Sequence, residues 1–323
     1  MHKSVGFVVA VCLVVASIRS SASATEESVQ PILRIGPTGP IVRNHTGFNW
    51  TEGPASDRDG NLNFTDYDHP TIYRVDVAGR LSAFLKHDQR PNGLFFKAPG
   101  NLAACERLGR VILISLQDKS IRPLAAEYNG NRLNAPNDLM IDRSGGAYFT
   151  DPHFRAPMPQ GVPGVYYLAR DGKINRLVED LYSPNGIILS PDEKTLYVVP
   201  TLLSGVMAYE VARLGVLGEE NVFFRLKRRT TANGKAGIGQ YGGNGMTVDV
   251  KGNLYITSAL GIQVYDPGGN LLCIIPIPEP MSNLTFGGSD RRTLFVTAST
   301  SLYAMTMKNA GRLFPAAESD QDN

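Results

Sequence analysis

Six short polar turns recur along the chain, and each contains a side chain whose oxygen could bind a metal ion. The residues at corresponding positions are Glu52, Asn92, Asn137, Asn185, Asn244 and Asn283. Successive members lie 40, 45, 48, 59 and 39 residues apart, in or near the range of repeats that form propeller blades. Carboxylate and amide oxygens that converge from several directions suit a hard divalent cation, and Ca²⁺ tolerates such a geometry best.

Each of these turns also has a purely structural interpretation. Asn and Gly adopt the left-handed backbone of tight turns, and Asn side chains cap nearby amides. Glu52 fits this interpretation poorly, because Glu is a weak turn former and a buried carboxylate needs a partner. A cation among the six turns would provide that partner.

The segments between the turns predict short antiparallel strands. Each turn precedes an apolar strand, a polar turn and a second apolar strand, as in SDRDGNLNFTDY (56–67), IDRSGGAYFTDP (141–152) and LSPDEKTLYVVP (189–200). A third strand follows in most repeats, and no long stretch has helical periodicity. Six such units, stacked radially, predict an all-β, six-bladed β-propeller with a metal site in its central channel.

A ring of blades must also close. The segment ILRIGPTGPIVRN (32–44) is strand-like and belongs to no complete repeat. We expect it to complete the last blade, on which residues 302–307 lie. Equivalent residues of every repeat would then face one another at the mouth of the channel.

The two ends of the chain predict segments outside the propeller. A basic start, an apolar run over residues 5–18 and the small-x-small sequence Ala22-Ser23-Ala24 are typical of a cleaved secretory signal. The apolar run is too short for an ordinary transmembrane helix. We therefore predict a signal peptide at 1–24, the propeller at 25–314 and a disordered tail at 315–323, in a protein that is exported and has no membrane partner.

The charge of the chain bears on its partners, and the positions of its cysteines bear on disulfide formation. The chain has 32 Lys and Arg against 30 Asp and Glu, and cleavage after Ala24 would remove two basic residues, so nucleic acid is not an expected partner. The basic cluster at 225–229, beside a glycine-rich stretch, is interpreted as a loop. Cys105 and Cys273 fall in the second and fifth repeats, on opposite sides of a six-fold ring, so we expect them to be unpaired.

Five motifs together resemble the senescence marker protein, gluconolactonase and luciferin-regenerating enzyme family over nearly all of the mature chain. They are WTEGP (50–54), RLNAPNDLMIDRSGGAYFTDP (132–152), SPNGIILSPDEKTLYV (183–198), GGNGMTVDVKGNLYIT (242–257) and FGGSDRRTLFVTASTSLY (286–303). The resemblance implies a six-bladed propeller that holds a divalent metal in its channel. By this resemblance the metal ligands are Glu52, Asn137, Asn185 and Asn244.

Asn244 departs from the family pattern, which has Asp at this position. The family's Asp is the favoured general base, and an amide cannot accept a proton at neutral pH, although its oxygen can still bind metal. Activity would then need another base, for which Glu52, Asp138 and His153 are the candidates near the motifs. One fewer negative ligand should also weaken Ca²⁺ binding.

The resemblance implies a metal-dependent hydrolase that acts on a sugar-acid lactone, with Ca²⁺ as the expected metal and Zn²⁺ or Mn²⁺ as alternatives. A second hypothesis, favoured by Asn244, is a metal-stabilised propeller that binds a sugar or sugar acid without turnover. A third is a related aryl-ester or organophosphate hydrolase. The sequence contains no GxSxG, HExxH or phosphate-binding GxxxxGK[ST] motif, so it gives no support to a serine hydrolase, a zincin or a P-loop enzyme.

Overall fold

The computed structural model describes residues 34–154, 158–228 and 242–313, which belong to a compact unit spanning residues 31–323. The expected signal peptide (1–24), the expected tail (315–323) and much of the expected basic, glycine-rich loop lie outside these residues. None of the described segments is a helix with the length and apolar character needed to cross a membrane.

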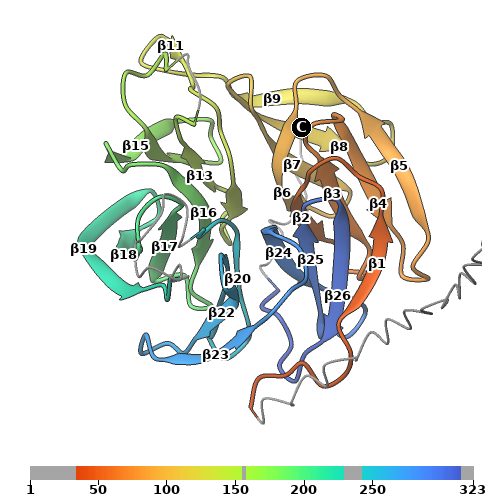
Figure 1. The fold of residues 1–323 in the computed structure, drawn as a ribbon. Coiled ribbons are helices and arrows are strands. Elements are labelled where there is room, and N and C mark those ends of the chain that lie inside the picture. The colour runs from red at the N-terminus through yellow and green to blue at the C-terminus, as the bar shows by residue number, and fades with distance from the viewer. Residues whose placement is uncertain (1–33, 155–157, 229–241, 314–323) are drawn as a thin grey trace, which may run out of the picture. The chain divides into compact units, whose positions relative to one another are not determined.

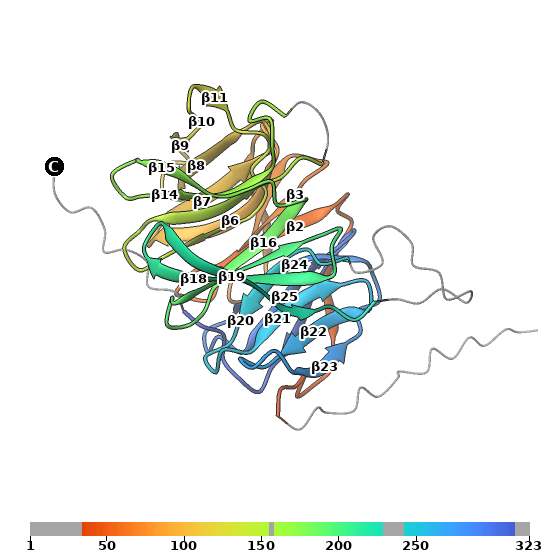
Figure 2. The ribbon, with the colours of Figure 1, turned by 90° about the vertical axis from the view of Figure 1, so that its left-hand side faces the viewer.

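Six four-stranded antiparallel sheets form a closed ring (Figure 1). The innermost strands β2, β6, β12, β16, β20 and β24 each contact the next, and β24 contacts β2. Figure 2 shows the same blades from the side. The predicted six-bladed β-propeller is therefore confirmed.

The first three blades are continuous in sequence, and a small hairpin separates the second from the third. Blade 1 contains β2 (Thr51–Ser56), β3 (Leu62–Asp66), β4 (Thr71–Val75) and β5 (Leu81–Lys86). Blade 2 contains β6 (Pro91–Ala98), β7 (Asn101–Glu106), β8 (Arg110–Ser115) and β9 (Ile121–Ala125), and the hairpin follows as β10 (Glu127–Tyr128) and β11 (Asn131–Arg132). Blade 3 contains β12 (Leu139–Ile141), β13 (Ala147–Asp151), β14 (Gly164–Leu168) and β15 (Ile174–Glu179).

The last three blades complete the ring. Blade 4 contains β16 (Pro184–Leu189), β17 (Thr195–Pro200), β18 (Gly205–Arg213) and β19 (Val216–Arg225). Blade 5 contains β20 (Met246–Val248), β21 (Leu254–Ser258), β22 (Gly261–Tyr265) and β23 (Leu271–Ile275). Blade 6 contains β24 (Met281–Gly287), β25 (Thr293–Ala298), β26 (Ser301–Thr306) and β1 (Val42–Thr46).

Blade 6 is built from both ends of the described chain. β1 pairs antiparallel with β26, with Val42 opposite Ala304 and Thr46 opposite Ser301. The expectation that the segment before Glu52 completes the last blade is confirmed. The hydrogen bonds between β1 and β26 join the segment before blade 1 to the last strand of the chain, and this pairing closes the ring.

The hydrophobic core lies between adjacent blades. Residues of the middle strands, such as β13, β14, β21 and β22, are buried throughout because both faces of each sheet pack against a neighbour. The fourth strands, such as β5 and β9, are largely exposed. Cys105 and Cys273 lie in blades 2 and 5 and are both free thiols, as predicted.

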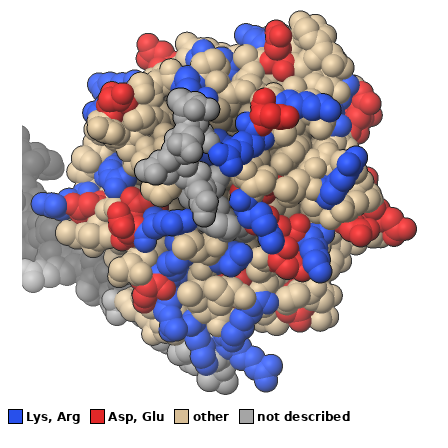
Figure 3. Space-filling view, turned by 180° about the vertical axis from the view of Figure 1, so that it is seen from behind, with Lys and Arg blue, Asp and Glu red and all other residues tan. Residues whose placement is uncertain are grey.

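Charged side chains of both signs are interspersed on the face shown in Figure 3. This distribution agrees with the small formal net charge of +2 for the whole chain. A single-sign surface of the kind that tracks a nucleic acid backbone is not visible on this face.

Hydrogen bonds between the innermost strands hold adjacent blades together around the channel. The amides of Gly93, Gly186 and Gly245 donate to the carbonyl oxygens of Asn137, Asn244 and Ser282, over 2.9, 2.8 and 2.9 Å. Threonine hydroxyls make the alternate links: Thr65 to the Asn92 carbonyl at 3.2 Å and Thr150 to the Asn185 carbonyl at 2.7 Å. Ser282 Oγ donates to the Thr51 carbonyl and joins blade 6 to blade 1.

Glycine is required where two of these strands approach most closely. A Cβ on Gly186 would lie 2.2 Å from the Asn244 carbonyl oxygen, and one on Gly53 would lie 1.9 Å from the Asn92 carbonyl oxygen. Gly53 also has φ = +44°, in the region that side chains disfavour. The glycines of the recurring turns therefore allow blade-to-blade contact, in addition to turning the chain.

We predict that Gly186→Ala lowers the free energy of unfolding by about 2–4 kcal/mol, because the new methyl group overpacks the blade 4–blade 5 contact and breaks its hydrogen bond. Urea denaturation measures this change. Gly39→Ala is the matched control, since a Cβ there meets no atom within 4 Å. Equal stability of the two variants would contradict the role assigned to Gly186.

Candidate metal centre

A cavity of about 230 Å³ opens at one end of the channel and brings together the four predicted metal ligands. It is lined by Trp50, Glu52, Tyr67, Asn92, Asn137, Phe154, Asn185 and Asn244. The predicted ligands come from blades 1, 3, 4 and 5, so only the closed ring brings them together. In blades 1 and 4 the strand register shifts at the ligand position, which frees these residues from regular pairing.

Glu52 places a carboxyl group in this cavity away from water. Its side chain is only 8% exposed. Trp50 Nε1 donates to Oε1 at 3.3 Å, and the Gly53 amide donates to Oε2 at 3.4 Å. Burial nevertheless raises the pKa of Glu52 to about 8, with a further contribution from the nearby Asp138 carboxyl. The cavity therefore favours a neutral group, or a carboxylate neutralised by a cation.

Asn185 has an amide oxygen without a hydrogen-bond partner. Its Nδ2 donates to Thr201 Oγ1 at 2.8 Å, which fixes the amide orientation. Its Oδ1 is buried and makes no hydrogen bond within the structure. Since a buried, unsatisfied carbonyl oxygen is costly, a cation that accepts its lone pair would remove that cost.

The donor set fits a divalent metal ion. Glu52 and Asn185 offer a buried carboxyl group and an orphaned amide oxygen, and Asn137 and Asn244, whose side chains also carry amide oxygens, line the same cavity. These are hard oxygen donors with one charge, which suit Ca²⁺ better than metals that prefer nitrogen or sulfur. Within the described residues no group of three or more His, Cys, Asp or Glu side chains forms an alternative metal site.

Two aspartates at strand ends hold the backbone segments that precede the ligands. At the end of β13, Asp151 accepts hydrogen bonds from the amides of Asn134 (2.8 Å) and Ala135 (2.7 Å). At the end of β3, Asp66 accepts from the amides of Asn49 (3.1 Å) and Trp50 (3.0 Å). The repeated FTD sequence therefore orients the loops that lead to Asn137 and Glu52.

Asn283 does not belong to the ring of cavity-lining turns, contrary to the sequence pattern. Ser282 occupies the equivalent position, since its carbonyl accepts from Gly245 as the Asn137 carbonyl accepts from Gly93. The alignment of Asn283 with the other asparagines is therefore wrong by one residue. Its side chain instead lies one residue further along the innermost strand.

At that next position Asp138 and Asn283 meet across the channel. Asn283 Nδ2 donates to Asp138 Oδ2 at 3.2 Å, and the Leu139 amide donates to Asp138 Oδ1 at 2.9 Å. These residues come from blades 3 and 6, which are opposite in the ring. The other four blades have glycine at this level (Gly53, Gly93, Gly186 and Gly245), which leaves room for the two side chains. We call this pair the cross-channel bridge.

The three candidate general bases, Glu52, Asp138 and His153, lie in different parts of the structure. Glu52 is the one carboxylate among the described residues that line the cavity. Asp138 lies in the cross-channel bridge, and burial raises its pKa to about 7. His153 is exposed and does not line the cavity, although its neighbour Phe154 does.

Aromatic residues form a part of the site that the turn pattern did not identify. Trp50 and Tyr67 line the cavity beside Glu52. A contiguous cavity of about 160 Å³ is lined by Tyr67, Phe154 and Arg107, and the Arg107 guanidinium lies 5.3 Å from the centre of the Tyr67 ring. Trp50 lies inside the WTEGP motif, whereas nothing in the sequence around Arg107 connects it with the recurring turns.

Comparisons with known proteins agree with this architecture. A model of the SMP-30/Gluconolactonase/LRE-like region matches residues 50–300. The chain is 27% identical over 298 residues to a gluconolactonase of Zymomonas mobilis, a match that covers 84% of this chain and 82% of that protein.

Comparison with solved structures also finds a gluconolactonase of similar fold. A gluconolactonase of Xanthomonas campestris superposes with a TM-score of 0.74 at 29% identity, over 83% of this chain and 89% of the other. Regucalcin of Agrobacterium tumefaciens, described as a calcium-binding protein, has a TM-score of 0.70 at 22% identity, over 85% of this chain and 95% of the other. The latter similarity shows a shared fold.

We predict that Asp151 makes stability depend on pH. Burial raises its pKa from 3.8 to about 7 in the folded protein. The folded state therefore binds this proton more tightly than the unfolded state between about pH 4 and 7, so the free energy of unfolding falls as pH rises through that window, by up to about 1.4 kcal/mol per pH unit.

Urea denaturation at several pH values checks this dependence. The Asp151→Asn variant should lose less stability than the wild type between pH 5 and 7, while Asp171→Asn, at an exposed turn, should follow the wild type. A wild-type slope that survives unchanged in Asp151→Asn would exclude Asp151 as its source.

Proposed function

The chain belongs to the SMP-30/gluconolactonase/LRE-like family, and from this premise we propose that it is a metal-dependent hydrolase that opens a sugar-acid lactone. Its relatives of known name include gluconolactonases. The N-terminal sequence supports the further proposal that the protein acts after export.

One observation carries the proposal: a residue with a buried carboxyl group and a residue with a partnerless amide oxygen line the same small cavity. Glu52 and Asn185 would be poorly accommodated there without a cation. Asn137 and Asn244 complete a set of four oxygen donors from four blades. We assign these four residues as the metal ligands, with Ca²⁺ as the metal that the donor chemistry favours.

When bound, a divalent cation would polarise the lactone carbonyl and stabilise the negative charge that develops on its oxygen. The protein groups have separate tasks. Trp50 and the Gly53 amide orient the Glu52 carboxylate through their hydrogen bonds. Thr201 accepts a hydrogen bond from the Asn185 amide and fixes its orientation.

Proton removal from the attacking water falls to Glu52 in this proposal. Glu52 is the one carboxylate among the described residues that line the cavity, so it is the group placed there that can accept a proton. Asn244 contributes an oxygen and no basicity. His153, exposed outside the cavity lining, remains a second candidate base for a substrate that reaches the rim.

The cavity dimensions favour a small polar substrate. Its volume of about 230 Å³ lies below the roughly 300–1,000 Å³ of pockets for drug-sized ligands. Arg107 and Tyr67, in the contiguous cavity, offer a cation and a phenol that could hydrogen-bond hydroxyl or carboxylate groups. A single sugar-acid ring combines these features.

A binding protein without turnover is the second candidate function. Asn244, where the family motif has Asp, leaves the cavity with one carboxylate among its described residues. A site of this kind could hold a metal and a sugar without an efficient base. Metal binding and catalysis must therefore be tested separately.

We predict that Glu52→Gln weakens Ca²⁺ binding by at least about 100-fold, because it removes the one charged ligand. Asn137→Ala and Asn185→Ala should each weaken it by less, since each loses one neutral oxygen. Isothermal titration calorimetry on chelator-treated protein measures the three affinities. Unchanged affinity in Glu52→Gln would rule out this cavity as the metal site.

Hydrolysis of gluconolactone tests the function, with Asn244→Asp as the informative variant. We expect the wild type to be active with Ca²⁺, Zn²⁺ or Mn²⁺ and inactive with chelator. Asn244→Asp should bind Ca²⁺ more tightly and turn over about tenfold faster or more, since a general base contributes roughly 10²–10⁴. If the variant binds tighter without gaining rate, Glu52 or His153 is the base. A wild type that binds the sugar but never hydrolyses it supports the binding protein instead.

A further inference from the structure

The chemistry of the channel changes from one residue level to the next along the innermost strands. A level is the set of six residues, one from each blade, that lie at the same depth in the channel. The level of the candidate metal ligands is polar. The next level, one residue further along each chain segment, consists of four glycines and the cross-channel bridge of Asp138 and Asn283. The third level is apolar and consists of Pro54, Leu94, Leu139, Ile187, Met246 and Leu284. The apolar level therefore lies beyond the bridge from the metal centre.

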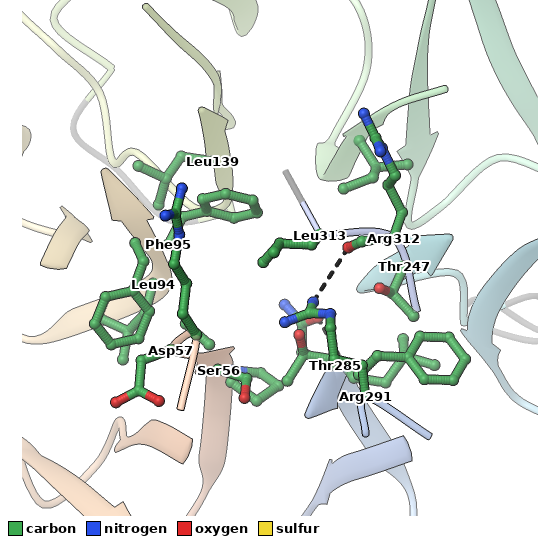
Figure 4. Close-up of a pocket in the computed structure, with 18 of the residues that line it drawn as sticks. Ser56, Asp57, Leu94, Phe95, Leu139, Thr247, Thr285, Arg291, Arg312 and Leu313 are labelled. Atoms are coloured by element: carbon green, nitrogen blue, oxygen red, sulfur yellow. Dashed lines mark hydrogen bonds between the residues drawn. The ribbon is translucent and has the colours of Figure 1, made fainter. Parts of the chain in front are cut away.

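A second cavity of about 240 Å³ occupies this apolar part of the channel (Figure 4). Its walls include Leu94, Leu139, Ile187, Met246 and Leu284, each from the innermost strand of a different blade. Asp138 and Asn283 are also among its lining residues. Since these two side chains are hydrogen-bonded across the channel, the bridge separates this cavity from the metal centre.

A short strap, Gly311–Leu313, runs beside the cavity and links blades 5 and 6. The Gly311 amide donates to the Arg291 carbonyl at 2.8 Å, and the Arg312 amide donates to the Val248 carbonyl at 3.0 Å. Leu313 projects toward the middle of the cavity in Figure 4. The strap therefore places backbone and an apolar side chain on one side of the opening.

Arg291 contributes a partly buried cation to this cavity, whose lining also includes Arg58 and Arg312. Its Nε and Nη2 donate to the carbonyl oxygens of Gly311 (3.4 Å) and Arg312 (3.2 Å). Its Nη1 is buried and makes no hydrogen bond within the structure. The nearby Asp57 carboxylate does not serve this guanidinium, because it already pairs with Arg74 at 2.9 Å.

Apolar third-level side chains beside the arginines of the lining are complementary to an amphipathic anion, although Asp57 and Asp59 also line the cavity. The hydrocarbon part of such a molecule would gain from burial against the third-level side chains. A carboxylate would be stabilised by the positive charge of the Arg291 guanidinium, which belongs to the lining of the cavity.

We propose that this second cavity binds an amphipathic monocarboxylate of medium chain length, with its carboxylate on Arg291 and its chain against the apolar third level of the channel. The volume of about 240 Å³ suits a chain of roughly eight to twelve carbons. The site is separate from the lactone site in chemistry and in position, and the two are divided by the cross-channel bridge. The proposal does not depend on the hydrolase function.

Calorimetric titration of the purified protein with decanoate tests the proposal, in buffer with chelator so that calcium soaps cannot form. We expect saturable binding of one decanoate per chain, and gluconate, a carboxylate without an apolar chain, should not displace it. Decanol, which has the chain without the charge, should bind at least about tenfold more weakly.

Variants locate the site. Arg291→Met should weaken decanoate binding by about tenfold or more, the loss expected for one hydrogen bond to a charged group. Arg292→Met is the matched control, because Arg292 is exposed and does not line the cavity. Thr285→Phe, on the cavity wall, should block binding by filling the chamber, and it tests the site even if Arg291→Met is poorly folded.

Three results would overturn the proposal. Absence of saturable binding, equal binding of decanol and decanoate, or unchanged affinity in both Arg291→Met and Thr285→Phe would each do so. Thermal unfolding of every variant without ligand shows whether its fold is intact. Because chelated protein is used throughout, failure here would leave the metal-dependent lactonase proposal untouched.

Discussion

The close approach of the six innermost strands is the constraint on which the rest of the structure depends. Their links run from blade to blade through glycine amides, threonine hydroxyls and Ser282. A side chain at Gly53 or Gly186 would collide with the neighbouring carbonyl oxygen. Because the channel is so narrow, side chains from different blades converge on one cavity, and two residues of opposite blades can form the cross-channel bridge.

The repeating part of the fold could be predicted from the sequence because each repeat carries the same local signals. The polar turns and the buried second and third strands are regular, and the strand that closes blade 6 had no other partner. The fourth strand of each blade could not be predicted from the sequence. Strands such as β5 and β9 are mostly exposed and lack the alternation of apolar and polar residues that marks a half-buried strand. Asn283 was misaligned because Ser282, one residue earlier, makes the blade contact that defines the ring.

That the four candidate ligands would line one cavity could be predicted from the sequence, but their surroundings in that cavity could not. Recurrence and family resemblance point to Glu52 and Asn185, whereas the desolvation of Glu52 and the partnerless oxygen of Asn185 arise from packing between blades. The same limit applies to Arg107 and Arg291. Both lie outside the recurring turns, and only the tertiary structure places them beside a cavity.

The pairing of β1 with β26 has a consequence for how the protein is made. Val42 and Ala304 are neighbours in the sheet but are separated by almost the whole length of the folded chain. Ring closure must therefore wait until the last strands have emerged, and such long-range pairing slows folding. Until β26 is available, β1 has no sheet partner, so blade 6 is the last blade that can be completed.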